Sequence, residues 1–387
     1  MEYVQDRVAT LHDFGDADPT FPADRTTVVV PITEREHASP AADHVFQTLA
    51  AVDPASTVVA LRARESTVAE VVEWIRSFDL GAEILWCTAP GVESLLTDAG
   101  LGGPPGKGRD VWLGLGRALE GGFVVVHDAD AGTYNERHVP KLAAPLTGDR
   151  AFVKGYYARV EDGRLYGRLF RLFYVPLVRA LADRVDDPIV DFLGAFRYAL
   201  AGEFAMTADL AGRVRAQRDW GFEVGTLGEV YGIAGFEGTA QVDLGVHEHA
   251  HRPVEGSTGL GDMCFEVADA VFRSLADAGV EPDYEGLRAA YQSRARNLLE
   301  QYAADAAFND FDYDIEAERE QVATYADAIR PPPEDRRLPA WEDAPIEPAA
   351  VRRRSAAALD ALRDAGPGAA GPGGSAGSQS PPPSTER

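Results

Sequence analysis

The chain has 387 residues, enough for one large domain or two ordinary ones, and 45% of them are hydrophobic. This composition is typical of globular proteins and excludes a largely disordered chain. Asp and Glu number 62 against 37 Lys and Arg, so the formal net charge is −25. A surface with this excess repels nucleic-acid phosphates and anionic lipid headgroups, and we expect neither a nucleic-acid nor a membrane partner.

Lysine is nearly absent, with only Lys107, Lys141 and Lys154 among the 37 basic residues. An acidic surface that keeps Arg and loses Lys predicts a protein adapted to high salt, because dissolved ions screen the repulsion between carboxylates. The alternative is a mesophilic protein from a GC-rich genome. No secretory signal and no apolar stretch of membrane-spanning length is visible, so we expect a cytoplasmic protein. Cys87 and Cys264 match no metal spacing and lie in apolar stretches, which predicts buried free thiols.

The first third of the chain predicts strands that alternate with helices. Continuous apolar runs indicate buried strands, and apolar residues at helical spacing indicate the helices between them. The strands are expected at 27–31, 56–61, 82–87 and 123–127, and the helices at 43–52, 67–78 and 109–120. This alternation indicates a mostly parallel sheet with helices on both faces, an α/β domain of the nucleotide-binding type.

The remainder of the chain predicts a change of pattern and a helical end. Strands are expected at 151–160 and 239–247, helices at 166–185 and 220–233, a helical lobe over 262–308 and a short helix at 351–364. Residues 331–350 are Pro-rich and acidic, which favours a tether at the surface. The chain then divides into an N-terminal extension (1–25), the main α/β domain (26–255), a helical C-terminal lobe (256–330), a linker with a short helix (331–365) and a disordered tail (366–387).

Two carboxylates follow the fourth predicted strand, in the sequence VVVHDAD at 124–130. Ligands of open α/β sheets bind at the carboxyl ends of strands, and paired carboxylates one residue apart suit Mg²⁺ or Mn²⁺. Asp is also common in the turns that end strands, so a structural role for Asp128 and Asp130 is the alternative.

Glycines flank Lys107 in the sequence GPPGKGRDVW, residues 103–112, just before a predicted helix. Such a loop can present backbone N–H groups and one ammonium to a phosphate. The spacing is not that of a Walker P-loop, because Gly108 follows the lysine directly. A flexible turn is the alternative, but a lysine kept here in a lysine-poor chain favours a function.

Three histidines alternate after the last predicted strand, in the sequence VHEHAHRP at 246–253. If the strand continues, His247, His249 and His251 point to one side. Imidazoles on one face can ligate a metal, or bind phosphate when they are protonated. A zinc site completed by carboxylates and a solvated strand edge are the alternatives.

Glu223 stands among apolar and Gly residues where a helix is expected to begin. A carboxylate in this setting could contact sugar hydroxyls or act as a base. From the residues alone, an acid favoured by the helix dipole is the simpler explanation.

Six ordered segments at matching spacing resemble the glucosyl-3-phosphoglycerate synthases of glycosyltransferase family 81. These segments are 106–112, 128–130, 167–177, 200–205, 220–225 and 241–253, within a resemblance that runs from residue 26 to residue 276. The resemblance implies a GT-A fold, with a Rossmann-like and mostly parallel sheet. It implies the transfer of a hexose, expected to be glucose, from a UDP- or GDP-sugar to 3-phosphoglycerate or a related small anionic acceptor. Retention at the anomeric carbon, dependence on Mg²⁺ or Mn²⁺, compatible-solute synthesis, a homodimer and a halophilic archaeal host are the further expectations.

The resemblance also assigns roles to individual residues. The nucleotide-sugar site is expected to comprise Pro31, Thr33, Glu34, Lys107, Asp128 and Ala129, with Glu36 as the alternative to Glu34. The metal ligands are expected to be Asp130 and His249, the acceptor site Gly167, Arg168, His247 and His251, and the catalytic residue Glu223.

The sequence departs from the family pattern in the acceptor region. Phe170 replaces a threonine, His247 an arginine and His251 an asparagine. Losing a permanent guanidinium weakens the case for a phosphorylated acceptor. Two alternative functions therefore stay open: a nucleotide-sugar-binding protein that has altered or lost its acceptor specificity, and a sugar nucleotidyltransferase.

We expect residues 366–387 to be dispensable, because this Gly/Pro/Ser-rich tail has almost no side chains that can be buried. A chain that ends at residue 365 should keep full activity and the same melting temperature. Loss of activity on this truncation, with the melting temperature unchanged, would contradict the expectation.

Overall fold

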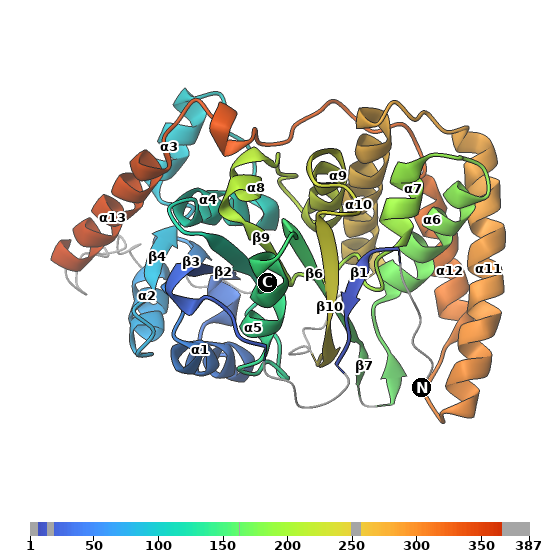
Figure 1. The fold of residues 1–387 in the computed structure, drawn as a ribbon, viewed down its shortest axis with the longest axis horizontal. Helices are drawn as coiled ribbons and strands as arrows, with labels where there is room; N and C mark the ends of the chain where they lie inside the picture. The colour runs from blue at the N-terminus through green and yellow to red at the C-terminus, as the bar shows by residue number, and fades with distance from the viewer. Residues whose placement is uncertain (1–6, 14–18, 162, 249–256, 366–387) are drawn as a thin grey trace, which may run out of the picture.

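A computed structural model describes residues 7–13, 19–161, 163–248 and 257–365 and shows one sheet of eight strands (Figure 1). Across the sheet the order is β1-β10-β6-β9-β5-β2-β3-β4. All neighbours are parallel except β9, which is antiparallel to both β5 and β6. The strands span Ala9–Leu11 (β1), Thr26–Thr33 (β2), Ser56–Arg62 (β3), Glu83–Trp86 (β4), Phe123–Val126 (β5), Phe152–Ala158 (β6), Phe204–Thr207 (β9) and Thr239–Val246 (β10).

Helices alternate with strands through the first third of the chain, as the sequence predicts. They are α1 (Pro40–Val52), α2 (Val68–Arg76), α3 (Pro90–Asp98), α4 (Lys107–Ala118) and α5 (His138–Ala143). The side chains of β2, β3 and β5 are almost all buried, because helices cover this mostly parallel sheet. Helix α4 packs directly on β2 and β3, with Gly114 against Val29. The predicted α/β fold is therefore confirmed.

Two helices of the helical lobe, α11 (Tyr284–Phe308) and α12 (Ile315–Tyr325), lie beyond β1 at one end of the sheet (Figure 1). The lobe packs on helices from earlier in the chain, with α11 against α6 (Val175–Ala182) and α10 (Ser257–Asp277) against α9 (Phe222–Ile233), and α11 also packs on α12. The helices of the rest of the chain are α6 (Val175–Ala182), α7 (Pro188–Gly194), α8 (Ala208–Arg213), α9 (Phe222–Ile233), α10 (Ser257–Asp277), α11 (Tyr284–Phe308), α12 (Ile315–Tyr325) and α13 (Pro348–Ala365). A π-helical turn at Phe170–Tyr174 (η4) leads into α6, and short 3₁₀ turns stand at Ala23–Arg25 (η1), Glu34–Glu36 (η2), Ala144–Thr147 (η3), Ala326–Ala328 (η5) and Trp341–Asp343 (η6). A small antiparallel hairpin joins β7 (Val160–Glu161) to β8 (Arg164–Leu165).

Two segments are more ordered than the sequence indicates. Within the expected N-terminal extension, β1 pairs in parallel with β10 and so forms the edge of the main sheet. The expected surface tether at 331–350 is wrong in its middle, because Leu338 is fully buried and Trp341 nearly so. Acidic and Pro-rich composition predicts a solvated tether, but these two apolar side chains anchor it.

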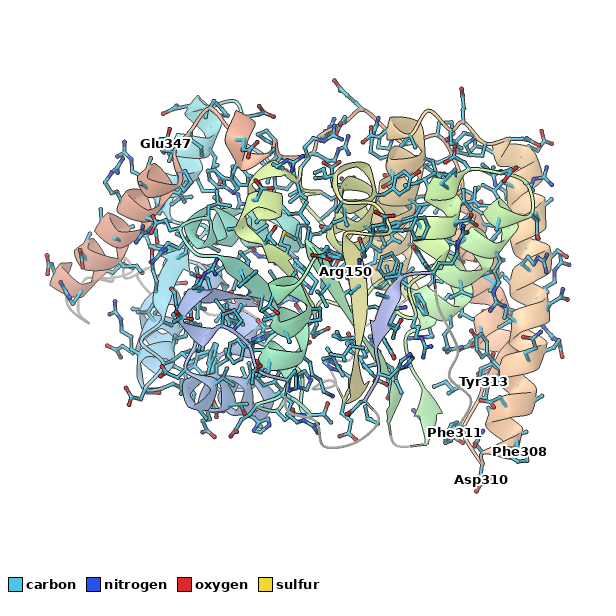
Figure 2. All side chains as sticks on the ribbon, in the orientation of Figure 1. Arg150, Phe308, Asp310, Phe311, Tyr313 and Glu347 are labelled. Carbon is cyan, nitrogen blue, oxygen red and sulfur yellow. The ribbon has the colours of Figure 1, made fainter. Side chains whose placement is uncertain are left out.

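Cys87 and Cys264 are buried free thiols, as predicted. Within the described ranges, no helix combines the length and apolar character needed to span a membrane. Helix α11 ends at Phe308, which is 89% exposed, and Phe311 lies near it at the same tip of the molecule (Figure 2). The predicted disordered tail lies outside the described residues.

The first turn of α4 is close to another backbone segment, which yields a prediction. A Cβ atom at Gly108 would lie 1.9 Å from the carbonyl oxygen of Gln217, so the backbone must move to admit it. We expect Gly108→Ala to lower the free energy of unfolding by about 1–3 kcal/mol, the usual cost of overpacking. Urea unfolding measures this change.

A matched control is Gly232→Ala in the last turn of α9, where no heavy atom lies within 4 Å of the new Cβ. Because Ala is the better helix former by about 1 kcal/mol, this variant should be neutral or slightly more stable. We call residues 103–112 the Lys107 loop. Equal unfolding free energies for the two variants would contradict the close packing of this loop against Gln217.

Candidate functional site

Three residues from distant parts of the chain meet at the carboxyl edge of the sheet. Lys107 opens α4, Asp128 follows β5, and Glu223 lies in the first turn of α9. The Lys107 Nζ lies 2.7 Å from Asp128 Oδ1 and 2.7 Å from Glu223 Oε1. Its side chain is only 12% exposed. The structure therefore brings together three residues that the sequence analysis had assigned to the donor and catalytic sites.

Glycine makes this close convergence possible. A Cβ at Gly202 would lie 2.2 Å from Asp128 Oδ2 and 3.0 Å from Lys107 Nζ. A side chain there would push into the ion pair, so only glycine lets the turn before β9 approach it. Gly106 has the same role in the loop, since a Cβ there would lie 2.2 Å from the carbonyl oxygen of Arg218.

The charges of the site keep Lys107 as an ammonium. Burial by itself lowers the pKa of a lysine, but the charges of Asp128 and Glu223 outweigh burial and raise the pKa of Lys107 above its ordinary value. Lys107 also lies over the ring of Trp220, with Nζ 5.9 Å from the centroid, and that ring is partly exposed. An ammonium held between two carboxylates is thus fixed beside a partly exposed aromatic ring.

Asp130 is the candidate metal ligand that the structure describes. Its Oδ1 is buried and has no hydrogen-bond partner within the described part of the chain. Burial, and then the neighbouring charge of Asp128, raise the pKa of Asp130 to about 6. A buried carboxylate oxygen that lacks a donor fits a divalent cation, because a cation would compensate both effects.

The second expected ligand, His249, lies outside the described residues. Within the described ranges, no three or more His, Cys, Asp or Glu side chains are gathered so as to hold a metal ion. Of the two expected metal ligands, Asp130 is the one that the structure describes, and its role as a ligand stays a prediction.

Two buried ionisable groups behind the site, Lys154 and Glu203, were missed in the sequence analysis. Lys154 on β6 donates to the carbonyl oxygen of Ala201 at 2.5 Å, and Glu203 follows in the same turn. Burial lowers the pKa of Lys154 to about 8, whereas burial and the charge of Asp128 raise the pKa of Glu203 to about 7. The signal for Lys154 was its rarity, since a lysine in the middle of a buried strand of a lysine-poor chain calls for a reason.

The end of β2 carries the other expected donor residues. Glu36 accepts hydrogen bonds from the backbone N–H and the hydroxyl of Thr33, each at 2.7 Å, and this capping box closes the turn after Pro31. Glu34 instead forms an ion pair with Arg64 at 2.7 Å. A hydrogen bond from Thr67, followed by the backbone N–H of Arg64, lowers the pKa of Glu34. Both carboxylates have partners, but Glu36 is buried whereas the Glu34 side chain is 22% exposed, so Glu34 is the more accessible of the two.

The expected acceptor residues are only partly placed. Gly167 adopts a positive φ of 70°, and Arg168 beside it is exposed. Phe170 packs on Tyr198 with ring centroids 4.7 Å apart, so it lines this region with an aromatic face. His251 lies outside the described residues.

His247 differs from expectation in its protonation. Its ring is buried and stacks on Tyr157, with centroids 4.0 Å apart. Burial, and then the charge of Arg159, lower the pKa of His247 to about 4. A protonated His247 that binds phosphate near neutral pH is therefore not supported, because the buried imidazole is neutral there.

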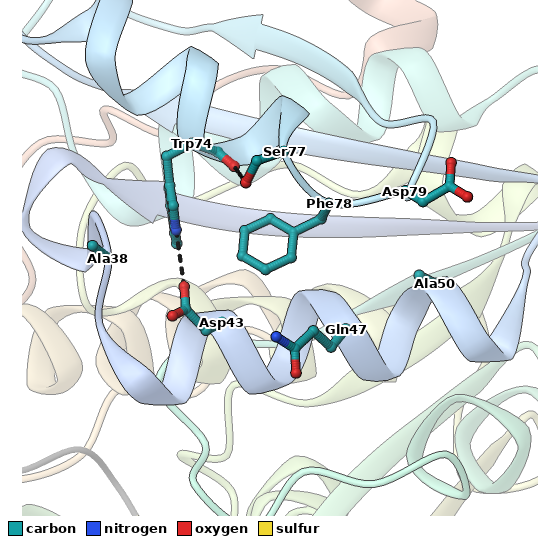
Figure 3. A pocket seen from close by; sticks show the side chains of 8 residues that line it. All are labelled: Ala38, Asp43, Gln47, Ala50, Trp74, Ser77, Phe78 and Asp79. Atoms are coloured by element: carbon teal, nitrogen blue, oxygen red, sulfur yellow. Dashed lines mark hydrogen bonds between the residues drawn. The ribbon is translucent and has the colours of Figure 1, made fainter.

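A pocket of about 580 Å³ opens elsewhere, between α1 and α2 (Figure 3). Trp74 Nε1 donates to Asp43 Oδ1 at 2.9 Å across this pocket, and Phe78 lies beside them. None of the expected site residues lines it. The candidate site is thus identified by converging charges and not by the shape of a cavity.

Comparison with known proteins places the chain among enzymes of one activity. No family model matches the sequence. The glucosyl-3-phosphoglycerate synthase of Methanococcoides burtonii is 33% identical over 367 residues, which cover 87% of this chain and 90% of the relative. The enzyme of the same name from Persephonella marina is 34% identical over 322 residues, which cover 78% and 80%.

A solved structure supports the fold. Glucosyl-3-phosphoglycerate synthase from Mycobacterium tuberculosis, in complex with Mg²⁺ and UDP, matches with a TM-score of 0.54 and 24% identity over 71% of this chain and 88% of that one. The same enzyme was solved with Mn²⁺, UDP-glucose and phosphoglyceric acid, at the same TM-score. Mg²⁺ and Mn²⁺, the cofactors expected from the sequence, are therefore the ions that the M. tuberculosis enzyme binds together with UDP.

Lys154 yields a pH-dependent prediction. Its folded pKa of about 8 lies below the ordinary value of 10.5, so the unfolded chain binds more protons between these values. The contribution of Lys154 to folding stability should therefore rise with pH in this window, and Lys154→Met should remove that contribution. Urea unfolding of both proteins from about pH 7 to pH 10.5 measures the difference in unfolding free energy.

The wild type should gain stability relative to Lys154→Met as the pH rises. Comparing the two proteins cancels every group that they share. A difference that stays constant across the window would show that the ammonium is not penalised by burial.

Proposed function

The chain belongs to the glucosyl-3-phosphoglycerate synthase family, and on that premise we propose that this glycosyltransferase transfers glucose from UDP-glucose to 3-phosphoglycerate, with retention at the anomeric carbon. The observation that carries the proposal is the Lys107–Asp128–Glu223 cluster, together with the buried Asp130 Oδ1, which has no hydrogen-bond partner among the described residues. The complexes of the M. tuberculosis enzyme with UDP-glucose and phosphoglyceric acid support the choice of substrates. The product would be an anionic solute suited to a cell under osmotic load.

The donor half of the site is built around fixed charge. Asp130, together with His249, would hold the divalent ion, and a bound ion would neutralise the charge that develops on the departing diphosphate. Lys107 adds a second positive charge at the start of α4, where backbone N–H groups also favour an anion. Because Asp128 and Glu223 hold the ammonium in place, little side-chain entropy is lost when the donor binds.

Glu223 is the candidate for contact with the transferred sugar. Its carboxylate is nearly buried, and one oxygen accepts from Lys107. A carboxylate has further acceptor positions, so Glu223 can accept hydrogen bonds from sugar hydroxyls while Lys107 keeps it oriented. This fixes the hexose relative to the acceptor, which is the positioning that transfer requires.

The acceptor half of the site supplies one permanent cation. Arg168 is exposed beside Gly167 and can pair with a phosphate or carboxylate by two parallel hydrogen bonds. Phe170 packs on Tyr198 and presents an aromatic face nearby. Together they suit a small anionic acceptor with an apolar or sugar-like edge.

A second candidate function follows from one observation. His247 stands where the family has an arginine, and it is buried and stacked on Tyr157. With one cation fewer at the acceptor, a protein that binds the nucleotide sugar without transferring glucose to phosphoglycerate is the alternative.

Incubation with defined substrates distinguishes these functions. UDP-glucose and GDP-glucose would each be offered with 3-phosphoglycerate, glycerate or glycerol 3-phosphate, with Mn²⁺ and KCl. The proposal predicts glucosyl-3-phosphoglycerate, identified by mass and by an NMR coupling that reports the retained anomer. Binding of UDP-glucose without any glucosylated product would favour the second function.

Variants of two carboxylates test the site itself. Asp130→Asn should abolish transfer at ordinary metal concentrations, and Glu223→Gln should lower kcat by about 10²–10³, as the loss of one preorganised group typically does. The matched control is Glu83→Gln on β4, a carboxylate paired with Arg117 and Arg352 away from the site. Wild-type kcat in Glu223→Gln would remove that residue from the site.

A further inference from the structure

The segment between α12 and α13 crosses the molecule from the helical lobe to the first half of the sheet (Figure 1). We call residues 331–347 the C-terminal strap. Its central part is buried, with Leu338 fully inaccessible and the side chain of Arg337 only 4% exposed. A connecting segment whose central side chains are buried is held in one place, and it can therefore restrict the movement of the backbone segments that pack against it.

The strap contacts the backbone segment that supports the Lys107 loop. Leu338 and Ala216 exchange two backbone hydrogen bonds, at 2.8 and 3.0 Å, and form an antiparallel bridge. Arg218 donates from Nε to the carbonyl oxygen of Arg336 at 2.7 Å. The strap therefore lies behind residues 216–218 and fixes their backbone.

Residues 216–218 in turn touch the loop. The backbone N–H of Arg109 donates to the carbonyl oxygen of Arg218 at 3.1 Å. Gly106 and Gly108 both press against this segment so closely that no Cβ would fit at either position. A glycine-rich loop has high conformational entropy when it is free. The contacts with residues 216–218 therefore restrict this loop and keep Lys107 in one position.

The strap also packs against α4, the helix that begins at Lys107. The rings of Trp341 and Trp112 stack with centroids 4.0 Å apart and an interplanar angle of 8°. Each indole donates to the opposite backbone at 2.8 Å, Trp341 to the carbonyl oxygen of Trp112 and Trp112 to that of Pro339. Gly116 leaves the room for this stack, because a Cβ there would lie 2.5 Å from the Trp341 ring.

A charged network ties the same strap to α9, the helix that carries Glu223. The Nη1 of Arg337 lies 2.8 Å from Glu229 of α9 and 2.7 Å from Asp277, while its Nη2 lies 2.6 Å from Asp335. Arg215 pairs with Glu229 and Asp277 as well. The strap thus contacts both helices whose first turns supply the Lys107–Glu223 ion pair.

We propose that the C-terminal strap, through Trp341, positions the Lys107 loop for binding of the nucleotide-sugar donor. Trp341 and Leu338 are positioning residues, since they act through Trp112 and residues 216–218 and do not touch the site. The proposal rests on the proposed function only for its kinetic consequence. Its structural consequence, a loop held rigid by the strap, can be measured without any turnover.

The test uses the full chain with Trp341→Ala, the conservative variant Trp341→Phe, and Arg352→Ala as the control. Arg352 lies in α13, beyond the strap, and pairs with Glu83 and Glu120. Hydrogen exchange followed by mass spectrometry reports on residues 103–112. Steady-state kinetics with UDP-glucose and 3-phosphoglycerate report separately on the two substrates.

Trp341→Ala should speed exchange in residues 103–112 by about tenfold, because it removes a stacked aromatic pair and the hydrogen bond of its indole. The KM for the donor should rise by about threefold to tenfold, with the KM for the acceptor and kcat within about twofold of wild type. Trp341→Phe should recover most of both effects, and Arg352→Ala should show neither.

Two results would overturn the proposal. One is faster exchange confined to the strap itself, with residues 103–112 unchanged. The other is an equal change in both KM values and kcat, which would indicate general destabilisation. If the wild-type chain transferred no glucose, the proposed function would fail, and the exchange data and titration with UDP and Mn²⁺ would still decide whether the strap supports the loop.

Discussion

The ammonium of Lys107 between the carboxylates of Asp128 and Glu223 is the interaction on which the site depends. It joins α4, the loop after β5 and α9, three elements separated by up to 116 positions in the chain, between residues 107 and 223. Two carboxylates this close to each other would repel if the cation were absent, because the site is largely withdrawn from water. Lys107 therefore stabilises the arrangement of the two acids that surround the expected sugar and diphosphate positions.

The glycines around this ion pair follow from the same constraint. A small, buried cation can hold two acids only if the backbones approach closely, and Gly106, Gly108 and Gly202 are the positions where they do. The lysine-poor composition gains a physical meaning here. Of three lysines in the chain, Lys107 and Lys154 stand in or directly behind the site, where each is buried beside acidic groups or carbonyl oxygens.

Much of the fold and part of the site could be predicted from the sequence. Continuous apolar runs located β2, β3, β4 and β5, because burial on both faces of a parallel sheet leaves that pattern, and alternating residues located β10. Two strands of this sheet were not predicted: β1, whose three residues are too few to show a pattern, and β9, which runs antiparallel to both of its neighbours. The D-x-D and G-K-G motifs pointed to Asp128 and Lys107, since local spacing carries their chemistry.

The features that the sequence did not reveal depend on tertiary contacts. Nothing in the strand that contains Lys154 shows that its ammonium donates to the carbonyl oxygen of Ala201, in the turn before β9. Likewise, nothing near His247 in the sequence shows that its ring stacks on Tyr157. The strap is the clearest case. Its acidic, Pro-rich composition indicates solvent exposure, whereas Leu338 and Trp341 are explained only by the partners they meet on α4 and at Ala216.

The most direct test of the central role of Lys107 is a calorimetric titration of the full chain with UDP in the presence of Mn²⁺. Lys107→Met should weaken UDP binding by at least about tenfold, the loss of one charge-assisted contact of about 1.5–3 kcal/mol. Lys141→Met is the matched control. Lys141 is also a buried lysine, but it lies in α5, pairs with Asp13 and donates to the carbonyl oxygen of Asp243 in β10. UDP affinity in Lys107→Met equal to that of wild type and of Lys141→Met would contradict a donor site built on this ammonium.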